Sequence, residues 1–269
     1  MNKLAFFKKK YHVKKGLRNK KSKKPLISLI TVVYNGEKYI QETIDSVSNQ
    51  KFKNYEYIII DGKSTDNTIN IIKKNLSKIN YWINEKDKGI YDAFNKGINL
   101  ASGDYICIVN SDDKLTPNAL SIIKKYINKH PNLDFIFGSV KKHWGILHGY
   151  KPEKIKYSWG FYSSHSTGFY IKRTSAEKIG KYNLKYKFHA DYDYFYRMIV
   201  KNNMRGIATK KNEVTGIFRR GGFSSRIHFR KSFFEEIKIR YDNDQSIIII
   251  LIITIYKLLN HFKKILFKK

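Results

Sequence analysis

Short apolar runs alternate with amphipathic segments through the first half of the chain. Four of the runs have the length and the β-branched or aromatic character of strands, and a polar turn follows each of them: 27–34, 57–60, 81–83 and 105–109. Between them, apolar residues recur with the 3.6-residue period of a helix, at Ile40, Ile44 and Val47, at Ile69, Ile72 and Leu76, and from Ile90 to Ala101. This alternation predicts an α/β fold with a mostly parallel sheet flanked by helices.

The pattern becomes mixed after about residue 130. Further strands are expected at 133–138 and 213–218, and a helix at 190–201. In the first half, Thr116 followed by Pro117 predicts the N-cap and first residue of another helix. A chain of 269 residues suits one large domain with an appendage better than two domains. We therefore predict one domain over residues 26–240, with a change of character near residue 130.

Positive charge is concentrated at the two ends of the chain. Lys and Arg number 53 against 22 Asp and Glu, which gives a formal net charge of +31. Residues 1–25 hold eleven Lys and Arg and no acid, and residues 257–269 hold five Lys and no acid. Such a chain attracts anionic partners, whether nucleic acid, an acidic membrane surface or phosphorylated substrates. We expect residues 1–25 to form a basic mobile arm, because they lack apolar periodicity.

The last segment, residues 241–269, contains an uncharged and largely apolar run at 247–256 that continues to 259 only across Lys257. As a helix this run is about 20 Å long, too short for a hydrocarbon core of about 30 Å. We therefore expect a membrane-associating tail, in which a helix lies in the lipid interface and Lys263, Lys264, Lys268 and Lys269 face lipid phosphates. The alternative is a helix packed on the domain or on a partner subunit.

The single cysteine and the N-terminus bear on the compartment. Cys107 lies in the apolar run 105–109, which is typical of a buried strand cysteine and excludes an intramolecular disulfide. The first apolar stretch, 4–7, is too short for the hydrophobic region of a secretory signal. The expected location is cytoplasmic, peripheral on the inner face of the cell membrane.

Polar residues end each of the four predicted strands. Ligands of open parallel sheets bind beyond the carboxyl ends of the strands, so these residues are the candidates for a site. Each segment alone is typical of a turn, because Asx and Gly residues favour turns. The segments read Thr31-Val32-Val33-Tyr34-Asn35-Gly36, Asp61-Gly62-Lys63-Ser64-Thr65-Asp66, Asn84-Glu85-Lys86-Asp87-Lys88-Gly89 and Asn110-Ser111-Asp112-Asp113.

Taken in order, these segments resemble family-2 glycosyltransferases of the GT-A fold, over residues 26 to about 120 and again at 189–197. The run Asp87-Lys88-Gly89-Ile90-Tyr91-Asp92-Ala93, followed by Asn95, looks like the colanic-acid-biosynthesis branch of that family. The resemblance implies a GT-A fold with a nucleotide-sugar-binding half, 26–130, and an acceptor-binding half, 131–240. It also implies a hexosyltransferase of cell-envelope polysaccharide biosynthesis.

The resemblance implies that the first half holds the sugar donor. Asp61 is expected to hydrogen-bond the edge of uracil or another base, and the backbone around Thr31, Val33 and Tyr34 to line the nucleoside pocket. The expected donor is a nucleotide sugar, with a UDP-sugar as the first candidate. Further donor-binding candidates are Lys88, Asp92, Asn95, Asn110, Ser111 and Asp112.

A divalent cation is expected beside the donor. The resemblance places Asp112 where the family supplies a ligand to Mn²⁺ or Mg²⁺ on the diphosphate, with Asp113 beside it. Hard cations prefer oxygen ligands, and a bound cation would neutralise charge on the departing nucleoside diphosphate. Asn110 stands where the family's first acid would be, so metal coordination is expected to rest chiefly on Asp112.

The reaction also needs a base, because an acceptor hydroxyl loses its proton as it attacks the anomeric carbon. In the segment His189-Ala190-Asp191-Tyr192-Asp193, Asp191 matches the family's catalytic aspartate, whereas Ala190 replaces the acid before it. From the residues alone, a carboxylate at a helix start is equally a cap, and Asp193 equally serves the helix dipole. Family-2 members resemble one another in inverting the anomeric configuration, which we expect here.

Two further segments resemble loops of the same branch. Ser164-His165-Ser166-Thr167-Gly168 is expected on the acceptor side, and Arg219-Arg220-Gly221-Gly222-Phe223-Ser224 on the diphosphate side. His165 is alternatively a surface histidine, and Arg220-Gly221-Gly222 a hairpin turn.

Two other function classes compete with a glycosyltransferase. The charge of +31 is typical of a nucleic-acid-binding protein. Acidic residues gathered at the strand ends would repel phosphates without a metal, so no nucleic acid is expected as partner. A catalytically silent membrane scaffold of the same fold is the second rival, because Asn110 and Ala190 replace acids. The expected acceptor is a glycan or a polyprenyl-linked glycolipid.

Overall fold

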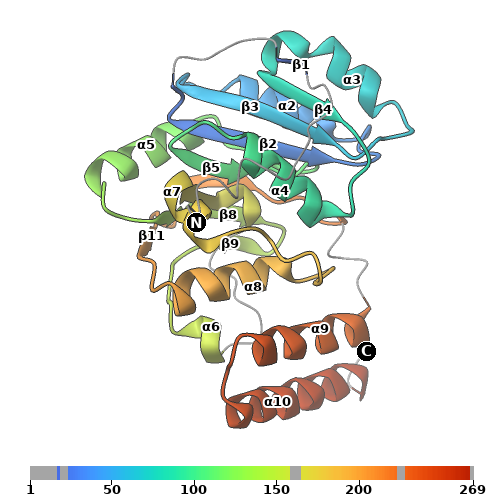
Figure 1. The fold of residues 1–269 in the computed structure, drawn as a ribbon, viewed down its shortest axis with the longest axis vertical. Helices are drawn as coiled ribbons and strands as arrows, with labels where there is room; N and C mark the ends of the chain where they lie inside the picture. Colours follow the sequence, from blue (N-terminus) through green and yellow to red (C-terminus); the bar gives the residue numbers. More distant parts are fainter. Residues whose placement is uncertain (1–16, 19–23, 158–164, 223–227, 267–269) are drawn as a thin grey trace, which may run out of the picture.

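The computed structural model describes residues 17–18, 24–157, 165–222 and 228–266, and side chains within the last range as far as residue 263. The first half confirms the predicted alternation of strands and helices (Figure 1). Its strands are β2 (Ile27–Val33), β3 (Tyr55–Asp61), β4 (Tyr81–Asn84) and β5 (Tyr105–Ile108). Its helices are α2 (Ile40–Ser48), α3 (Thr68–Lys74), α4 (Ile90–Leu100) and α5 (Ala119–Lys129), and the short 3₁₀ turn η1 (Leu76–Lys78) follows α3.

The central sheet has eight strands in the order β1-β4-β3-β2-β5-β10-β7-β11. The neighbours β4, β3, β2 and β5 are parallel, as the sequence predicts. β10 (Phe169–Lys172) runs antiparallel between β5 and β7 (Phe135–Phe137), and β11 (Gly206–Ala208) is parallel to β7. The carboxyl ends of the four parallel strands therefore lie along one edge, where the polar segments begin.

A second sheet of four strands, which the sequence did not predict, lies beside the first. Its order is β6 (Lys114–Leu115), β12 (Val214–Ile217), β8 (Ser139–Lys142) and β9 (Gly145–Leu147). The strand expected at 213–218 is β12, and the one expected at 133–138 is β7. The predicted N-cap at Thr116 is wrong, because α5 begins at Ala119 and the Thr116 hydroxyl donates to the Val214 carbonyl oxygen instead.

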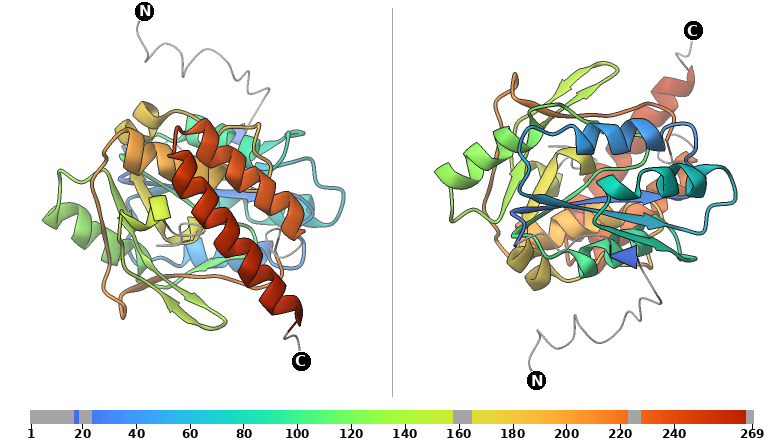
Figure 2. Two further views of the ribbon diagram at one scale, coloured as in Figure 1. Left: turned by 90° about the horizontal axis from the view of Figure 1, so that it is seen from below. Right: turned by 90° about the horizontal axis from the view of Figure 1, so that it is seen from above.

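The core has two layers, one on each face of the central sheet. Successive residues of β2 point to opposite faces, so Leu29 joins the cluster under α2, α3 and α5, whereas Ile30 joins the cluster under α4. Every residue of β2 is buried, which explains why all of its residues except Ser28 and Thr31 are apolar. Figure 2 shows helices on both sides of the sheet in the view from above.

The second half contributes helices that pack below the sheet (Figure 1). The helix expected at 190–201 is α8 (Ala190–Tyr196) followed by a π-helical turn (Arg197–Lys201). The others are α6 (Lys154–Tyr157), the 3₁₀ turn η2 (Ser166–Gly168), α7 (Arg173–Ile179), α9 (Phe229–Asp242) and α10 (Ile247–Leu266). The predicted domain end at residue 240 falls inside the last turn of α9, and the next helix begins at Ile247.

The two ends of the chain are described in part. Most of the predicted arm, 1–25, lies outside the described residues, although Leu17 and Arg18 form β1 and pair antiparallel with β4. In the predicted tail, α10 packs on α9 and buries Ile250 and Ile253. Lys268 and Lys269 lie outside the described residues, as does the side chain of Lys264. Within the described parts of the chain, no helix has both the length and the apolar character needed to cross a membrane.

Gly97 tests the contact between α4 and the sheet. A Cβ at this position would overlap the fully buried Ile30 side chain, so Gly97→Ala is expected to lower the free energy of unfolding by about 1–3 kcal/mol. The expected sign opposes the higher helix propensity of Ala. Urea denaturation measures the change, with Asn99→Ala in the same helix as the control. A Gly97→Ala protein as stable as the parent would contradict this packing.

Candidate active site

The loops at the carboxyl ends of β2 and β3 hold each other in place. Asn35, at φ 51°, donates its N–H to Ser64 Oγ at 2.8 Å, and its side-chain oxygen accepts from the Thr65 N–H at 2.8 Å. Next along the chain, the Gly36 N–H donates to Thr68 Oγ1 at 2.9 Å. These bonds make one rigid shelf from segments about thirty residues apart in the sequence.

Asp61 lies at the base of this shelf, with its side chain fully buried. Its carboxylate accepts from the Ser64 hydroxyl at 2.5 Å and from the Ser64 N–H at 3.2 Å. Burial raises the pKa of Asp61, and the bonds from Ser64 oppose that rise. Ser64, which the sequence analysis did not single out, therefore fixes the Asp61 carboxylate.

Of the three residues expected to line a nucleoside pocket, two have buried side chains. The Thr31 hydroxyl accepts from the Tyr57 hydroxyl at 2.9 Å, and Val33 belongs to the core cluster under α2. Only their backbone atoms can face a ligand, as the sequence analysis supposed. Tyr34, which is 64% exposed, is the first side chain beyond β2 that is free to contact a planar group.

The segment that joins β4 to α4 is built around buried ion pairs. The Asp92 carboxylate accepts from the Lys88 N–H at 3.0 Å and lies 3.5 Å from Lys96 Nζ, which also pairs with Glu85 at 3.0 Å. Asn95 is buried and exchanges two hydrogen bonds with the Tyr182 backbone, at 2.9 and 2.8 Å. Asp92 and Asn95 thus support the fold at the site, and the Lys88 side chain is exposed.

The segment after β5 carries four of the predicted residues. Asn110 donates to Ser166 Oγ at 2.9 Å, while its side-chain oxygen is buried and has no partner among the described residues. The Ser111 carbonyl oxygen accepts from the Thr43 hydroxyl at 2.9 Å, which anchors the segment to α2. A buried acceptor without a donor is unusual and points to a group that binds beside it.

The neighbouring aspartates Asp112 and Asp113 have different surroundings. Asp113 is buried, and its carboxylate accepts from the Thr167 hydroxyl at 2.8 Å and from the Arg219 N–H at 3.1 Å. Burial raises the pKa of Asp113 to about 6. The Asp112 carboxylate is partly exposed, and burial and then the charge of Asp113 raise its pKa. Asp112 is therefore the aspartate that is available to a ligand.

Three residues far from the predicted strand ends complete this side of the site. His165 Nδ1 lies 3.3 Å from Asp113 Oδ2, and its ring centroid is 4.6 Å from that of Phe218. Arg219 donates to the Asp112 carbonyl oxygen at 3.2 Å and lies over the Tyr39 ring. The two loops that the resemblance indicated therefore do meet Asp112 and Asp113, although Ser164, Phe223 and Ser224 lie outside the described residues.

His165 is held neutral. Burial lowers its pKa to about 4, and the nearby Lys142 ammonium acts in the same direction. The charges of Asp191 and Asp112 oppose this lowering of the His165 pKa. Lys142 belongs to β8, in the sheet that the sequence did not predict, so no local sequence pattern indicated that it lies near His165.

Asp191 is exposed at the start of α8. Its Oδ1 atom accepts from the Tyr192 N–H at 2.9 Å and lies 3.2 Å from the Tyr91 hydroxyl of α4. The Tyr91 hydroxyl is also 3.0 Å from the Phe188 carbonyl oxygen. No side-chain cap bond is found at this helix start. One carboxylate oxygen is thus fixed from the first half of the chain, and the other remains for a ligand.

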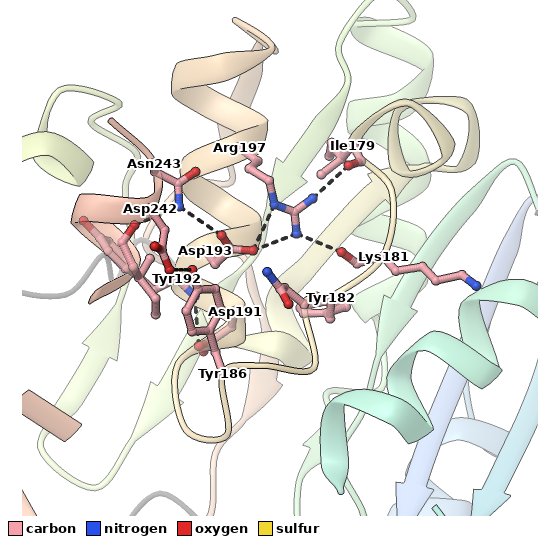
Figure 3. A network of polar contacts seen from close by, with 12 residues as sticks. Ile179, Lys181, Tyr182, Tyr186, Asp191, Tyr192, Asp193, Arg197, Asp242 and Asn243 are labelled. Carbon is pink, nitrogen blue, oxygen red and sulfur yellow. Dashed lines mark hydrogen bonds and ion pairs between the residues drawn. The ribbon is translucent and has the colours of Figure 1, made fainter. Parts of the chain in front are cut away.

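Figure 3 shows that Asp193 plays a separate, structural part. It is buried and pairs with Arg197 at 2.9 Å, and the Asn243 side chain donates to it at 3.0 Å. Arg197 also donates to the carbonyl oxygens of Ile179 and Lys181, both at 2.8 Å. This network ties α8 to α7 and to the end of α9.

Helix α9 supports the loop before Asp191, which the sequence analysis missed. Glu235 accepts from three successive backbone N–H groups, those of Lys187, Phe188 and His189, at 2.8, 2.6 and 2.8 Å. His189 Nε2 also lies 2.7 Å from Ser232 Oγ. Two adjacent glutamates, Glu235 and Glu236, in the helix FRKSFFEEIKIRYD were the available signal.

The oxygen donors of the site fit a divalent cation that is shared with a ligand. Within the described residues, no group of three or more His, Cys, Asp or Glu is arranged to hold a metal ion. Asp112 and the unpartnered Asn110 side-chain oxygen are two hard donors, two residues apart. Asp113 would first have to give up its present bonds. This set suits a cation that takes its remaining ligands from phosphate and water.

The chain is similar to known glycosyltransferases. The family model of glycosyl transferase family 2 matches residues 28–198. An uncharacterized glycosyltransferase of Methanocaldococcus jannaschii is 30% identical over 224 residues, which cover 78% of this chain and 77% of its own length. A PGL/p-HBAD biosynthesis glycosyltransferase of Mycobacterium bovis is 28% identical over 207 residues, which cover 72% of this chain and 79% of its own.

Solved structures share the fold at low identity. TarS (1–349) of S. aureus in complex with UDP-GlcNAc has a TM-score of 0.62 and 18% identity, over 80% of this chain and 65% of that chain. The mannosyltransferase PcManGT of Pyrobaculum calidifontis, in complex with GDP-Man and Mn²⁺, has a TM-score of 0.60 and 17% identity, over 87% and 69%. This chain therefore spans about two thirds of the TarS 1–349 chain, and 39% of the longer TarS chain.

The neutral state of His165 predicts a pH dependence of stability. Its folded pKa of about 4 lies below the usual 6.5, so its contribution is complete above pH 6.5 and is lost as the pH falls towards 4. The free energy of unfolding should fall more steeply between these values in the parent than in His165→Asn. Urea denaturation across this range measures both slopes, and an NMR titration locates the imidazole midpoint. Parallel slopes with a midpoint near 6.5 would contradict the assignment.

Proposed function

This chain belongs to glycosyl transferase family 2, and on that basis we propose that it moves one sugar from a nucleotide-diphosphate sugar to a lipid-linked or surface-polysaccharide acceptor. One observation carries the proposal. Asp112 and Asp191 come from opposite halves of the chain, and contacts join the two halves at each of them: Arg219 donates to the Asp112 carbonyl oxygen, and the Tyr91 hydroxyl donates to the Asp191 carboxylate. Donor and acceptor chemistry require two such carboxylates at one site, one for each substrate.

The donor is proposed to lie along the shelf formed by the loops after β2 and β3. Asp61, fixed by Ser64, is proposed to accept a hydrogen bond from the base once the residues that bury it move aside, and Tyr34 to lie against the base ring. UDP is the first candidate nucleotide, because TarS has been solved with UDP and with UDP-GlcNAc. The colanic-acid-type branch remains a prediction from the motif between residues 87 and 97.

The diphosphate is proposed to lie over Asp112. Arg219, held by Glu42 at 2.7 Å and by the Tyr39 ring, contacts the Asp112 backbone and can offer its positive charge to phosphate oxygens. Asp112 and the Asn110 oxygen would hold Mn²⁺ or Mg²⁺, which supplies a Lewis acid for the leaving diphosphate. PcManGT has been solved in complex with GDP-Man and Mn²⁺, which supports this choice of cofactor.

Asp191 is proposed as the general base. Its Oδ1 is fixed by Tyr91 and the Tyr192 N–H, so its other oxygen can accept the proton of the acceptor hydroxyl. The hydroxyl oxygen then bonds to the anomeric carbon as the bond to the diphosphate breaks. Attack from the face opposite the leaving group inverts the anomeric configuration. A catalytically silent scaffold would not need an exposed carboxylate held in a fixed orientation.

Asp191→Asn tests the base. The amide keeps the shape of the carboxylate but cannot accept the proton, so kcat should fall by at least about a hundredfold while donor binding is unchanged. Release of nucleoside diphosphate, with a short polyprenyl-diphosphate glycan as acceptor, measures the rate. The exposed Asp244→Asn, whose carboxylate pairs with Lys201, is the matched control. Full activity of Asp191→Asn would remove Asp191 from the mechanism.

Asp112→Asn tests the cation. In the parent, UDP with Mn²⁺ at about a hundred times its dissociation constant should raise Tm by about 5–10 °C, since the ligand binds only the native state. The variant should lose the Mn²⁺-dependent part of this increase and keep the part due to UDP alone. Thermal unfolding with UDP, with Mn²⁺ and with both measures the difference. An unchanged Mn²⁺ effect would place the cation elsewhere.

A further inference from the structure

Helix α10 lies beside α9 at the end of the molecule farthest from the central sheet, the lower end in Figure 1. Figure 2 shows the two helices from below. The helix has 20 residues. Its inner side is buried against the domain at Ile250 and Ile253, and Lys257 lies 3.7 Å from the buried Glu236 of α9. The helix is therefore fixed to the domain along one side only.

The opposite side of α10 is a continuous apolar face. Its large side chains recur every three to four residues and are 55–69% exposed: Ile247, Ile248, Leu251, Ile252, Ile255, Tyr256, Leu259 and Phe262. Single exposed apolar side chains are common on soluble proteins, but a stripe along a whole helix marks a surface that another body covers. We call this stripe the apolar face.

Positive charge surrounds the apolar face. α10 contains no acidic residue, and exposed cations lie on both helices of the pair: Arg230, Lys231, Lys238 and Lys263. The acids of this region are engaged in contacts. Glu235 holds the loop before α8, Glu236 pairs with Arg240 of the same helix, and Asp242 accepts from Tyr186. The exposed Asp244, between α9 and α10, pairs with Lys201. The outer side of the helix pair therefore attracts anions.

We propose that α9 and α10 form a platform that binds the surface of an anionic lipid bilayer, with the apolar face among the lipid chains and the cations at lipid phosphates. α10 lies along the bilayer because its inner side is held on α9, where Lys257 pairs with Glu236 and His261 stacks on Phe229, while the exposed Lys263 belongs at the headgroup level. A second copy of this chain fits less well, since two such basic surfaces repel each other, whereas anionic lipid is complementary to both features.

The platform also has a direct connection to the candidate base. Glu235 and Ser232 of α9 bind the backbone and side chain of residues 187–189, which immediately precede α8 and Asp191. A bilayer bound at α10 would therefore lie on the same side of the molecule as the loop that positions Asp191. This arrangement suits an acceptor anchored in lipid, but bilayer binding itself does not depend on the identity of the acceptor.

Vesicle co-sedimentation of the full chain tests the platform. The parent should bind vesicles of phosphatidylcholine with phosphatidylglycerol, bind pure phosphatidylcholine weakly, and lose affinity as salt is raised. Leu251→Glu with Ile255→Glu should lower binding to the anionic vesicles by at least about tenfold. Trp144→Glu, which changes a side chain 60% exposed on the β8–β9 turn, should leave vesicle binding unchanged.

Circular dichroism and Tm show whether the double variant is folded. We expect it to fold, because both substituted side chains are exposed. Absence of parent binding to anionic vesicles would overturn the proposal, as would full binding by the folded double variant. Sedimentation also measures the oligomeric state of the parent and of the double variant in solution. If the parent is a dimer and the double variant a monomer, a second copy of the chain covers the apolar face, and this result would also overturn the proposal.

Discussion

The Tyr91 hydroxyl joins the two halves of the domain at the point where the chemistry is proposed. It lies within hydrogen-bonding distance of the Phe188 carbonyl oxygen and of Asp191, so a residue of α4 fixes the start of α8. The Tyr91 ring is stacked on Tyr182, which is stacked on Tyr194 with ring centroids 4.3 Å apart. Because these rings are buried, the hydroxyl has little freedom, and the position of Asp191 follows from the packing of the core.

Charge is distributed unevenly over the molecule, and the distribution matches the proposed substrates. The whole chain is strongly basic, yet Asp61, Asp112 and Asp113 gather at the carboxyl edge of the sheet. Burial raises the pKa of each, and Arg219 and Lys142 lie close to the last two. A diphosphate with its cation would complete this arrangement, because the cation offsets the acids and the basic residues receive the phosphate.

Helix α9 connects the proposed chemistry to the outer surface. Its inner side carries Glu235, which accepts three backbone N–H groups, and Arg240, which is fully buried over the Tyr192 ring. Its outer side is basic and lies next to α10. The same helix therefore holds the loop before Asp191 and supports the apolar face. A movement of α10 would reach the loop before Asp191 through this one helix.

The sequence by itself determined the parallel strands, the helices between them and the residues at the strand ends, because the period of apolar residues and the turn residues are local signals. It also indicated Asp112 and Asp191, through a resemblance in local motifs. Only the tertiary structure decided how these residues are used. Asn95 donates to the Tyr182 backbone, and Asp113 is buried and accepts from Thr167. Other residues support the site from elsewhere in the chain: Lys142, Ser64 and Glu235. Those roles arise from contacts between segments distant in the chain, which no local pattern of side chains encodes.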